Sequence, residues 1–181
     1  MESVPHSRYR LTVKVVPALA AAVALTAGVS HAGSSKASFP RCHTADLRVY
    51  LTGGRGAAGT LVADVAFRNR GARTCSVFGY PGLGLEDAHH RALPSRVTWG
   101  STVARRDSRP YRIVLLRGRA AFANMSWSDV PFGSERCVQP RWLAVTPPDE
   151  FTHRQVPFGA PVCNHGHLTV TALSRTRTPH G

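Results

Sequence analysis

The sequence predicts an all-β fold: a two-sheet antiparallel immunoglobulin-like sandwich preceded by a signal peptide. Apolar and polar residues alternate with a period of two through much of the chain, which is typical of strands with one buried face. Turn residues, chiefly Gly, Pro and Asn, separate these short runs at regular intervals. Four cysteines follow an uncharged apolar run near the N-terminus, so we expect an exported domain cross-linked by disulfides.

The first 32 residues have the pattern of a secretory signal. Basic residues precede the uncharged apolar run 15–29, and Ser30-His31-Ala32 supplies small residues at the two positions that a signal peptidase recognises. We expect cleavage after Ala32, with an uncleaved N-terminal anchor as the alternative. Cys42 lies ten residues beyond this site, too far for lipidation, so the general secretory route is favoured.

Removing these 32 residues from the 181 leaves 149, the usual size of one domain. We expect a flexible leader over 33–41, a β-sandwich domain over 42–173 and a disordered polar tail over 174–181. The formal net charge of +13 falls to +11 on processing, because three basic residues and one acidic residue leave. Such a basic surface attracts anionic polymers, including wall phosphates and lipid headgroups.

Nine segments are predicted to be strands, and the first two form a hairpin across the turn 53–59. In order, the strands are 47–51, 61–67, 75–78, 83–86, 96–99, 111–116, 119–127, 142–146 and 167–173. Large aromatic residues carry much of the burial in such cores, so six are expected to pack in the core or on the sheets. They are Phe67, Trp99, Tyr111, Phe122, Trp127 and Trp142.

The four cysteines of the mature chain are Cys42, Cys75, Cys137 and Cys163, an even number suited to two disulfides in an oxidising compartment. Three connectivities are compatible with the sequence. Pairing in sequence order keeps each loop local, and we favour it. Closing loops of about thirty residues stabilises a chain by about 3–4 kcal/mol each.

Several motifs in the mature region occur in an order that carries a family resemblance. They are Cys-x-x-Ala-x-Leu at 42–47, Gly-Ala-Ala-Gly at 56–59, Phe-Arg-Asn-Arg-Gly at 67–71, Cys75 followed by Gly-Tyr-Pro-Gly at 79–82, the Trp127 strand and two late cysteines. In this pattern the mature region resembles the secreted actinobacterial family catalogued as domain of unknown function 4232. The resemblance implies an exported or lipid-anchored β-sandwich. It implies no activity and carries over no catalytic residue.

As an alternative to a disulfide, Cys163 could belong to a metal site. Cys163, His165 and His167 would project from one face if the segment were an extended strand, and such ligands suit zinc or copper. No further ligand pair completes the shell, so no metal is expected. His89 and His90, beside Glu86 and Asp87 in a predicted turn, are the nearest approach to an acid–base cluster.

Other chemistries receive little support from the sequence. Residues 54–59 have the Gly-x-Gly-x-x-Gly spelling of a dinucleotide-binding loop, but a strand rather than a helix follows, so we interpret them as a hairpin connector and expect no cofactor. No serine-hydrolase elbow or His-Glu-x-x-His motif occurs, and no catalytic residue is assigned. The scattered arginines lack a nucleic-acid recognition pattern, and no nucleic-acid partner is expected.

One arginine-rich stretch could bind an anion. Arg105, Arg106, Arg109 and Arg112 would form a basic edge suited to an anionic wall polymer, or alternatively would protect an edge strand from aggregation. The sequence thus predicts a non-catalytic domain, secreted or cell-wall associated and not an integral membrane protein after cleavage, whose partner is an envelope component or another protein. The alternative is an envelope hydrolase or metal-binding protein that uses His165 and His167.

Overall fold

The structure, a computed structural model, describes residues 38–179. The predicted signal peptide 1–32 and most of the leader 33–41 lie outside the described residues. The described chain is all-β, with a single short 3₁₀ helix η1 (Thr44–Asp46). Within this range, no helix is long and apolar enough to cross a membrane.

The described residues form eleven strands, two more than predicted. They are β1 (Leu47–Ala57), β2 (Thr60–Asn69), β3 (Cys75–Val77), β4 (Gly82–Glu86), β5 (Ala92–Leu93), β6 (Arg96–Trp99), β7 (Ile113–Leu115), β8 (Ala120–Ser128), β9 (Trp142–Thr146), β10 (Arg154–Pro157) and β11 (His167–Val170). The two strands that were missed are β5 and β10.

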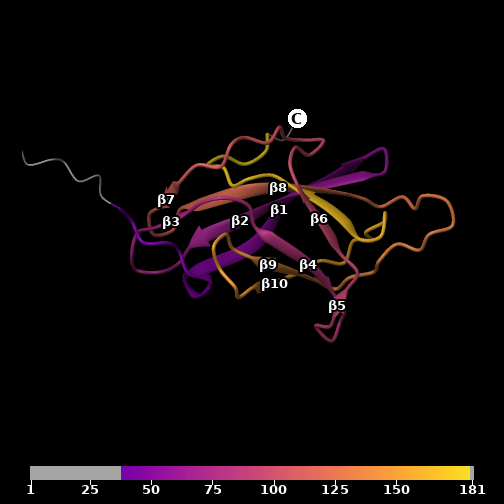
Figure 1. The fold of residues 1–181 in the computed structure, drawn as a ribbon, viewed down its shortest axis with the longest axis horizontal. Coiled ribbons are helices and arrows are strands. Elements are labelled where there is room, and N and C mark those ends of the chain that lie inside the picture. The colour runs from indigo at the N-terminus through magenta and orange to yellow at the C-terminus, as the bar shows by residue number, and fades with distance from the viewer. Residues whose placement is uncertain (1–37, 180–181) are drawn as a thin grey trace, which may run out of the picture. The chain divides into compact units, whose positions relative to one another are not determined.

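The strands form three sheets (Figure 1). The five-stranded sheet has the order β1-β2-β8-β11-β6, the four-stranded sheet β10-β9-β4-β5, and the smallest sheet pairs β3 with β7. Every pair is antiparallel except β11 with β6, which runs parallel. The prediction of purely antiparallel sheets was wrong at this edge, because alternation along a strand does not indicate in which direction its partner runs.

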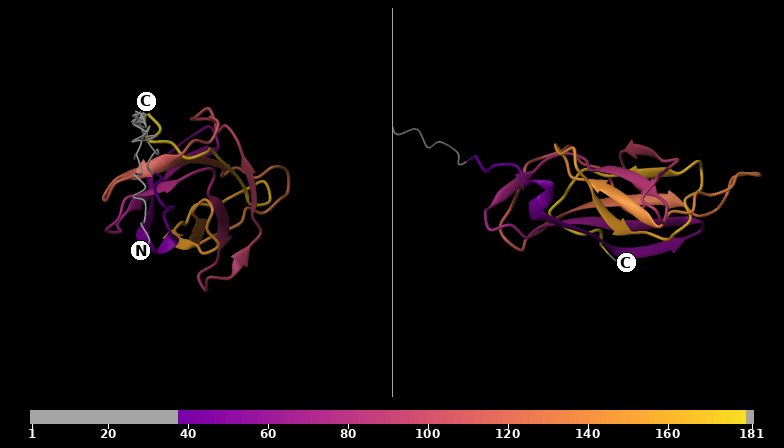
Figure 2. Two further views of the ribbon diagram at one scale, coloured as in Figure 1. Left: turned by 60° about the vertical axis from the view of Figure 1, so that its left-hand side comes forward. Right: turned by 90° about the horizontal axis from the view of Figure 1, so that it is seen from below.

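The β1–β2 hairpin is tighter and longer than predicted, and it can be followed in Figures 1 and 2. The strands continue to Ala57 and Thr60, so that only Ala58 and Gly59 form the turn. Both turn residues have positive φ, 50° and 78°, as the hairpin-forming type I′ turn requires. A register shift between Thr52 and Arg55 absorbs the preceding glycines. The dinucleotide-like motif therefore lies in a hairpin, as expected.

A single apolar cluster joins the inner faces of all three sheets. It includes Phe67 and Met125 from the five-stranded sheet, Leu143 from the four-stranded sheet and Leu115 from the smallest sheet, each 0–1% exposed. Along β2 and β8 these inward residues alternate with residues of the opposite, outer face. The middle of the outer face is buried as well, since Asp64 and Asn124 are each only 2% exposed.

The end of the described chain covers this outer face. Ser174 pairs with Phe122 of β8 through two backbone hydrogen bonds, and Thr178 is 4% exposed. In Figure 1 this yellow segment lies beside β8. A disordered tail was predicted over 174–181, but its described part, residues 174–179, is hydrogen-bonded to the sheet. The polar composition of the tail did not indicate these hydrogen bonds.

The aromatic residues are less uniformly buried than predicted. Phe67, Phe122 and Trp127 lie in buried positions, whereas Trp99 is 62% and Tyr111 is 41% exposed. Trp99 belongs to β6, which is the edge strand of its sheet among the described strands. Its ring instead stacks on Tyr80, with centroids 5.0 Å apart. The prediction placed the six aromatic residues in the core or on the sheets, and of these Trp99 and Tyr111 are not core residues.

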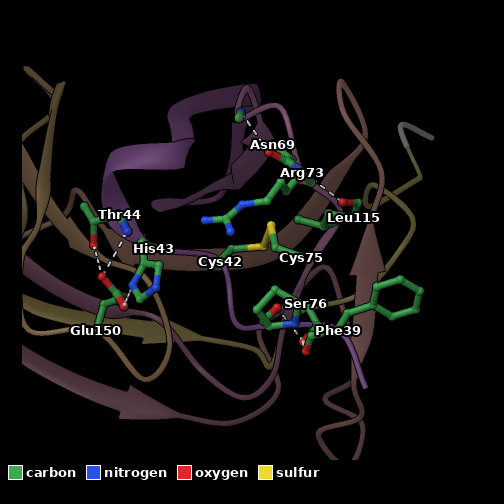
Figure 3. The surroundings of a disulfide bond; sticks show 12 residues. Phe39, Cys42, His43, Thr44, Asn69, Arg73, Cys75, Ser76, Leu115 and Glu150 are labelled. Atoms are coloured by element: carbon green, nitrogen blue, oxygen red, sulfur yellow. Dashed lines mark hydrogen bonds and ion pairs between the residues drawn. A yellow bond between two sulfur atoms is a disulfide. The ribbon is translucent and has the colours of Figure 1, made fainter. Parts of the chain in front are cut away.

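Two disulfides join the cysteines in sequence order, as favoured from the sequence: Cys42 with Cys75, and Cys137 with Cys163. The first, shown in Figure 3, attaches the segment 38–46, which precedes β1, to β3. The backbone N–H of Cys42 also donates to the carbonyl of Ser76. The second fixes the segment before β11, and there the N–H of Cys163 donates to the carbonyl of Ser128 at the end of β8.

Glu150 also binds the segment 38–46 that precedes β1 (Figure 3). Its side chain is 9% exposed, and its carboxylate accepts hydrogen bonds from the N–H and Oγ1 of Thr44, both at 2.9 Å. His43 and Arg41 also contact the carboxylate, at 3.1 and 3.3 Å. These donors, chiefly the Thr44 N–H, favour the charged form and lower the pKa of Glu150 below its ordinary value of 4.5.

The substitution Glu150→Gln tests this contact. A carboxyl whose pKa is lowered by folding stabilises the fold above its unfolded pKa, and that stability is lost as the pH falls through the folded pKa. At pH 7 we expect the free energy of unfolding, measured by urea titration, to be about 1 kcal/mol lower for the variant than for the wild type. The difference from wild type should shrink as the pH falls below about 4.5. Parallel stability curves from pH 7 to pH 3 would contradict this.

The disulfides give a second prediction. They close loops of 33 and 26 residues, so the chain-entropy model assigns each about 3–4 kcal/mol. Replacing either pair by alanine should lower the free energy of unfolding by that amount in urea titrations. A loss below about 1 kcal/mol for either pair would show that its loop is already constrained in the unfolded chain.

Candidate functional site

An open hollow lined by four arginines lies at the outer face of the five-stranded sheet. It encloses about 360 Å³. Its lining is formed by Tyr50, Arg68, Gly118, Arg119, Ala120, Phe122, Arg175 and Arg177, and we call it the basic hollow. These residues come from β1, β2, β8, the turn before β8 and the C-terminal segment 174–179.

The strand register explains why these side chains meet. Arg68 pairs with Arg48 of β1 on one side and with Ala120 of β8 on the other. Ala66, two residues before it, similarly lies between Tyr50 and Phe122. Residues paired across strands project to the same face, and residues two apart on one strand do so as well. The two rows therefore form a continuous outer surface of small, aromatic and basic side chains.

Aromatic rings and a carbonyl hold three of the basic groups in place. The Arg177 guanidinium carbon lies 5.3 Å from the centroid of Phe122, and that of Arg48 lies 5.8 Å from the centroid of Tyr50. Both distances are within the range of cation–π attraction. The Nε of Arg68 donates to the carbonyl of Gly118 at 2.9 Å. A stacked guanidinium keeps the N–H groups at its edge available to an oxyanion.

In the part of the chain that the structure describes, no acidic side chain pairs with the arginines of this surface. Among residues 38–179, none of Arg48, Arg68, Arg119, Arg175 and Arg177 forms an ion pair with a carboxylate. Like charges gathered around a concave surface concentrate the positive potential there. Arginine also binds phosphate and carboxylate oxygens in a bidentate manner. The hollow thus has the charge and the donors to bind an anion.

The arginine-rich stretch singled out from the sequence does not act as a unit in the structure. Arg105 donates to the carbonyl and hydroxyl of Thr176 at 3.0 and 3.1 Å, so it binds the C-terminal segment. Arg112 donates to the hydroxyl of Ser76. Arg106 and Arg109 are exposed, with no side-chain hydrogen bond within the described range.

Sequence reasoning missed the basic hollow because its arginines are scattered between positions 68 and 177. One signal was present, the pair Arg175 and Arg177 spaced two apart, as on one face of an extended segment. That signal fell in the segment predicted to be disordered.

The metal alternative fails in its geometry. Cys163 is bonded to Cys137, and Asn164, His165 and Gly166 all have positive φ, between 53° and 75°, so the segment is a turn rather than an extended strand. His167 shares a hydrogen bond with Thr98 at 2.9 Å. Burial lowers the pKa of His167, and the charge of Arg96 adds to this. Within 38–179 no three His, Cys, Asp or Glu side chains are arranged to hold a metal ion.

His89 and His90, the other histidine pair singled out from the sequence, do not contact the same carboxylate. His90 lies 3.4 Å from Glu86, while the second imidazole at that carboxylate, at 3.5 Å, belongs to His153 rather than His89. Gln155 of β10 donates to the same carboxylate at 3.0 Å. The ring of His90 also packs against Trp142, with centroids 5.0 Å apart. The sequence could not bring in His153, because β10 was not predicted.

The comparisons with known proteins give a family but no relative of known function. No curated protein and no solved structure matches the chain significantly. Residues 42–174 match the family described as "Domain of unknown function (DUF4232)". This match covers most of the chain and all of its described strands, and the chain therefore belongs to the DUF4232 family.

Proposed function

We propose that this chain is an exported, non-catalytic binding domain that associates with the cell envelope through an anionic ligand held in the basic hollow. The observation that supports it most is the gathering of four arginines around one hollow, none of which pairs with a carboxylate among residues 38–179. Surface arginines on soluble proteins are usually interspersed with acidic residues, which limits large fields of one sign. A concave field of one sign is suited to recruiting an oppositely charged polymer.

The location is part of the same proposal. The N-terminal signal pattern and the two disulfides are compatible with a domain that folds outside the cytoplasm, since disulfides persist in oxidising compartments. There the polymers of the envelope are the abundant polyanions, and a basic domain would encounter them first. We also propose that the sheets constitute an immunoglobulin-like sandwich, with the basic hollow on the outside of its larger sheet.

The ligand class follows from the donors. Guanidinium groups recognise oxygens of phosphate and carboxylate groups, and a repeating polymer can place several of them in one hollow. We favour a phosphate-bearing wall polymer, because phosphodiesters keep their charge over the whole range of envelope pH. The affinity should fall as salt rises, since the Debye length shortens from about 10 Å at 0.1 M to about 3 Å at 1 M.

Two double variants with equal charge change test the proposal. Arg119→Ala/Arg177→Ala removes two arginines of the hollow, and Arg106→Ala/Arg109→Ala removes two exposed arginines elsewhere. We expect the first variant to bind purified wall teichoic acid, a polyol-phosphate polymer, about tenfold more weakly, because solvent-exposed ion contacts are worth up to about 1 kcal/mol each and a loss of about 1.4 kcal/mol is a tenfold change in affinity. The second should bind within about twofold of wild type. Binding can be measured by calorimetry at 0.1 M salt.

The result can contradict the proposal in two ways. Equal losses in both variants would mean that only the net charge matters and that the hollow is no site. A wild-type protein that does not bind the polymer at low salt would exclude this ligand class.

A further inference from the structure

The C-terminal segment 174–179 supplies half of the arginines of the basic hollow. Arg175 and Arg177 belong to this segment, whereas Arg68 and Arg119 belong to the sheet and its turn. The segment is not itself a strand, and beyond the pairing of Ser174 with Phe122 its attachment depends on side chains. The hollow therefore exists in full only while this segment lies on the sheet.

A buried carboxylate on β2 fixes the far end of the segment. Asp64, 2% exposed, accepts hydrogen bonds from the backbone N–H of Thr178 at 2.8 Å and from its hydroxyl at 2.6 Å. The amide of Asn124 donates to the same carboxylate at 2.8 Å. A buried charge is costly unless donors satisfy it, so release of Thr178 must be accompanied by hydration of Asp64. The segment 174–179 therefore cannot leave the sheet without exposing the Asp64 carboxylate to water.

Two arginines outside the hollow support the same attachment. Arg105 binds the backbone and hydroxyl of Thr176, and Arg55 donates to the carbonyl of Pro179 at 2.7 Å. Arg177 lies between these anchored residues and stacks on Phe122. With both of its neighbours fixed, the side chain of Arg177 has little freedom to leave the hollow.

We propose that the Asp64–Thr178 contact is a latch that regulates anion binding by completing the basic hollow. This inference depends on the proposed function, because it concerns the same hollow. Asp64 is a positioning residue in this scheme: it carries a negative charge, yet it promotes the binding of an anion at a site whose lining does not include it. Ligand binding and segment docking stabilise each other, and their coupling is reciprocal.

The substitution Asp64→Asn separates the latch from electrostatics because the two predict opposite changes. Removing a negative charge makes the protein more basic and, on charge alone, strengthens binding of a polyanion. The latch predicts weaker binding, by about tenfold. The side-chain NH₂ group of the introduced asparagine cannot accept the hydrogen bonds that the Asp64 carboxylate accepts, so the segment would leave the sheet more often. Teichoic acid affinity measured by calorimetry decides between them. Unchanged or tighter binding by a folded Asp64→Asn protein would overturn the latch.

A second variant guards against a folding defect. Thr178→Val keeps the shape and the charge of the protein but removes the hydroxyl donor to Asp64. It should also weaken binding, while its core and both disulfides stay intact in near-ultraviolet circular dichroism and thiol titration. Normal affinity in Thr178→Val, with a detached segment, would also overturn the latch.

Proteolysis provides the reciprocal measurement. Trypsin cleaves after arginine, and Arg175 and Arg177 are exposed, so cleavage there depends on how often the segment leaves the sheet. Saturating teichoic acid should slow cleavage at these two bonds in the wild type, whereas Asp64→Asn should speed it in the absence of polymer. Cleavage that is insensitive to both changes would contradict the coupling.

The outcomes also distinguish the latch from the function on which it depends. If Arg119→Ala/Arg177→Ala loses affinity while Asp64→Asn and Thr178→Val do not, the hollow binds the polymer and the latch is wrong. If the wild type does not bind, the proposed function is wrong and the affinity tests of the latch have no signal. The cleavage rate of Asp64→Asn without polymer then still reports whether Asp64 holds the segment.

Discussion

The register between β2 and β8 is the constraint on which the rest of the structure depends. Nine consecutive pairs, from Thr60↔Ser128 to Arg68↔Ala120, connect these two strands in the middle of the five-stranded sheet. This register turns Val65 and Phe67 toward the core and Asp64 and Arg68 toward the outer face. A slip of one residue would exchange the two faces, placing a carboxylate and a guanidinium in the apolar cluster. The core and the basic hollow are thus two consequences of one pairing.

The outer face combines two environments that are usually kept apart. Near the middle of β2, Asp64 and Asn124 form a buried polar patch whose hydrogen bonds are completed by the C-terminal segment. At the start of β8, Arg119 and its neighbours are open to solvent and carry positive charge. The segment 174–179 connects the two, since it satisfies the buried patch and adds arginines to the open one. A structural contact and the proposed binding surface therefore share the same few residues.

The parts of this structure that depend on local pattern were predictable. Alternation along β1 and β2, the hairpin between them and the pairing of the cysteines in sequence order all follow from residues close in the chain. What depends on distant segments was not predictable. Alternation cannot tell that β11 pairs with β6 in parallel, nor that Trp99 faces solvent at that sheet edge. The tail 174–181 was predicted to be disordered because its composition is polar, but in its described part the polar Thr178 binds a buried acceptor on β2.

The central claim, that the outer face of the five-stranded sheet is an anion-binding surface, is tested most directly by nuclear magnetic resonance. Short glycerol-phosphate oligomers would be titrated into the labelled full-length protein, and the arginine Nε–H signals would be followed. The account predicts saturable shifts of Arg68, Arg119, Arg175 and Arg177, with backbone shifts over 174–179. Shifts confined to Arg106 and Arg109, or shared equally by all exposed arginines, would contradict it.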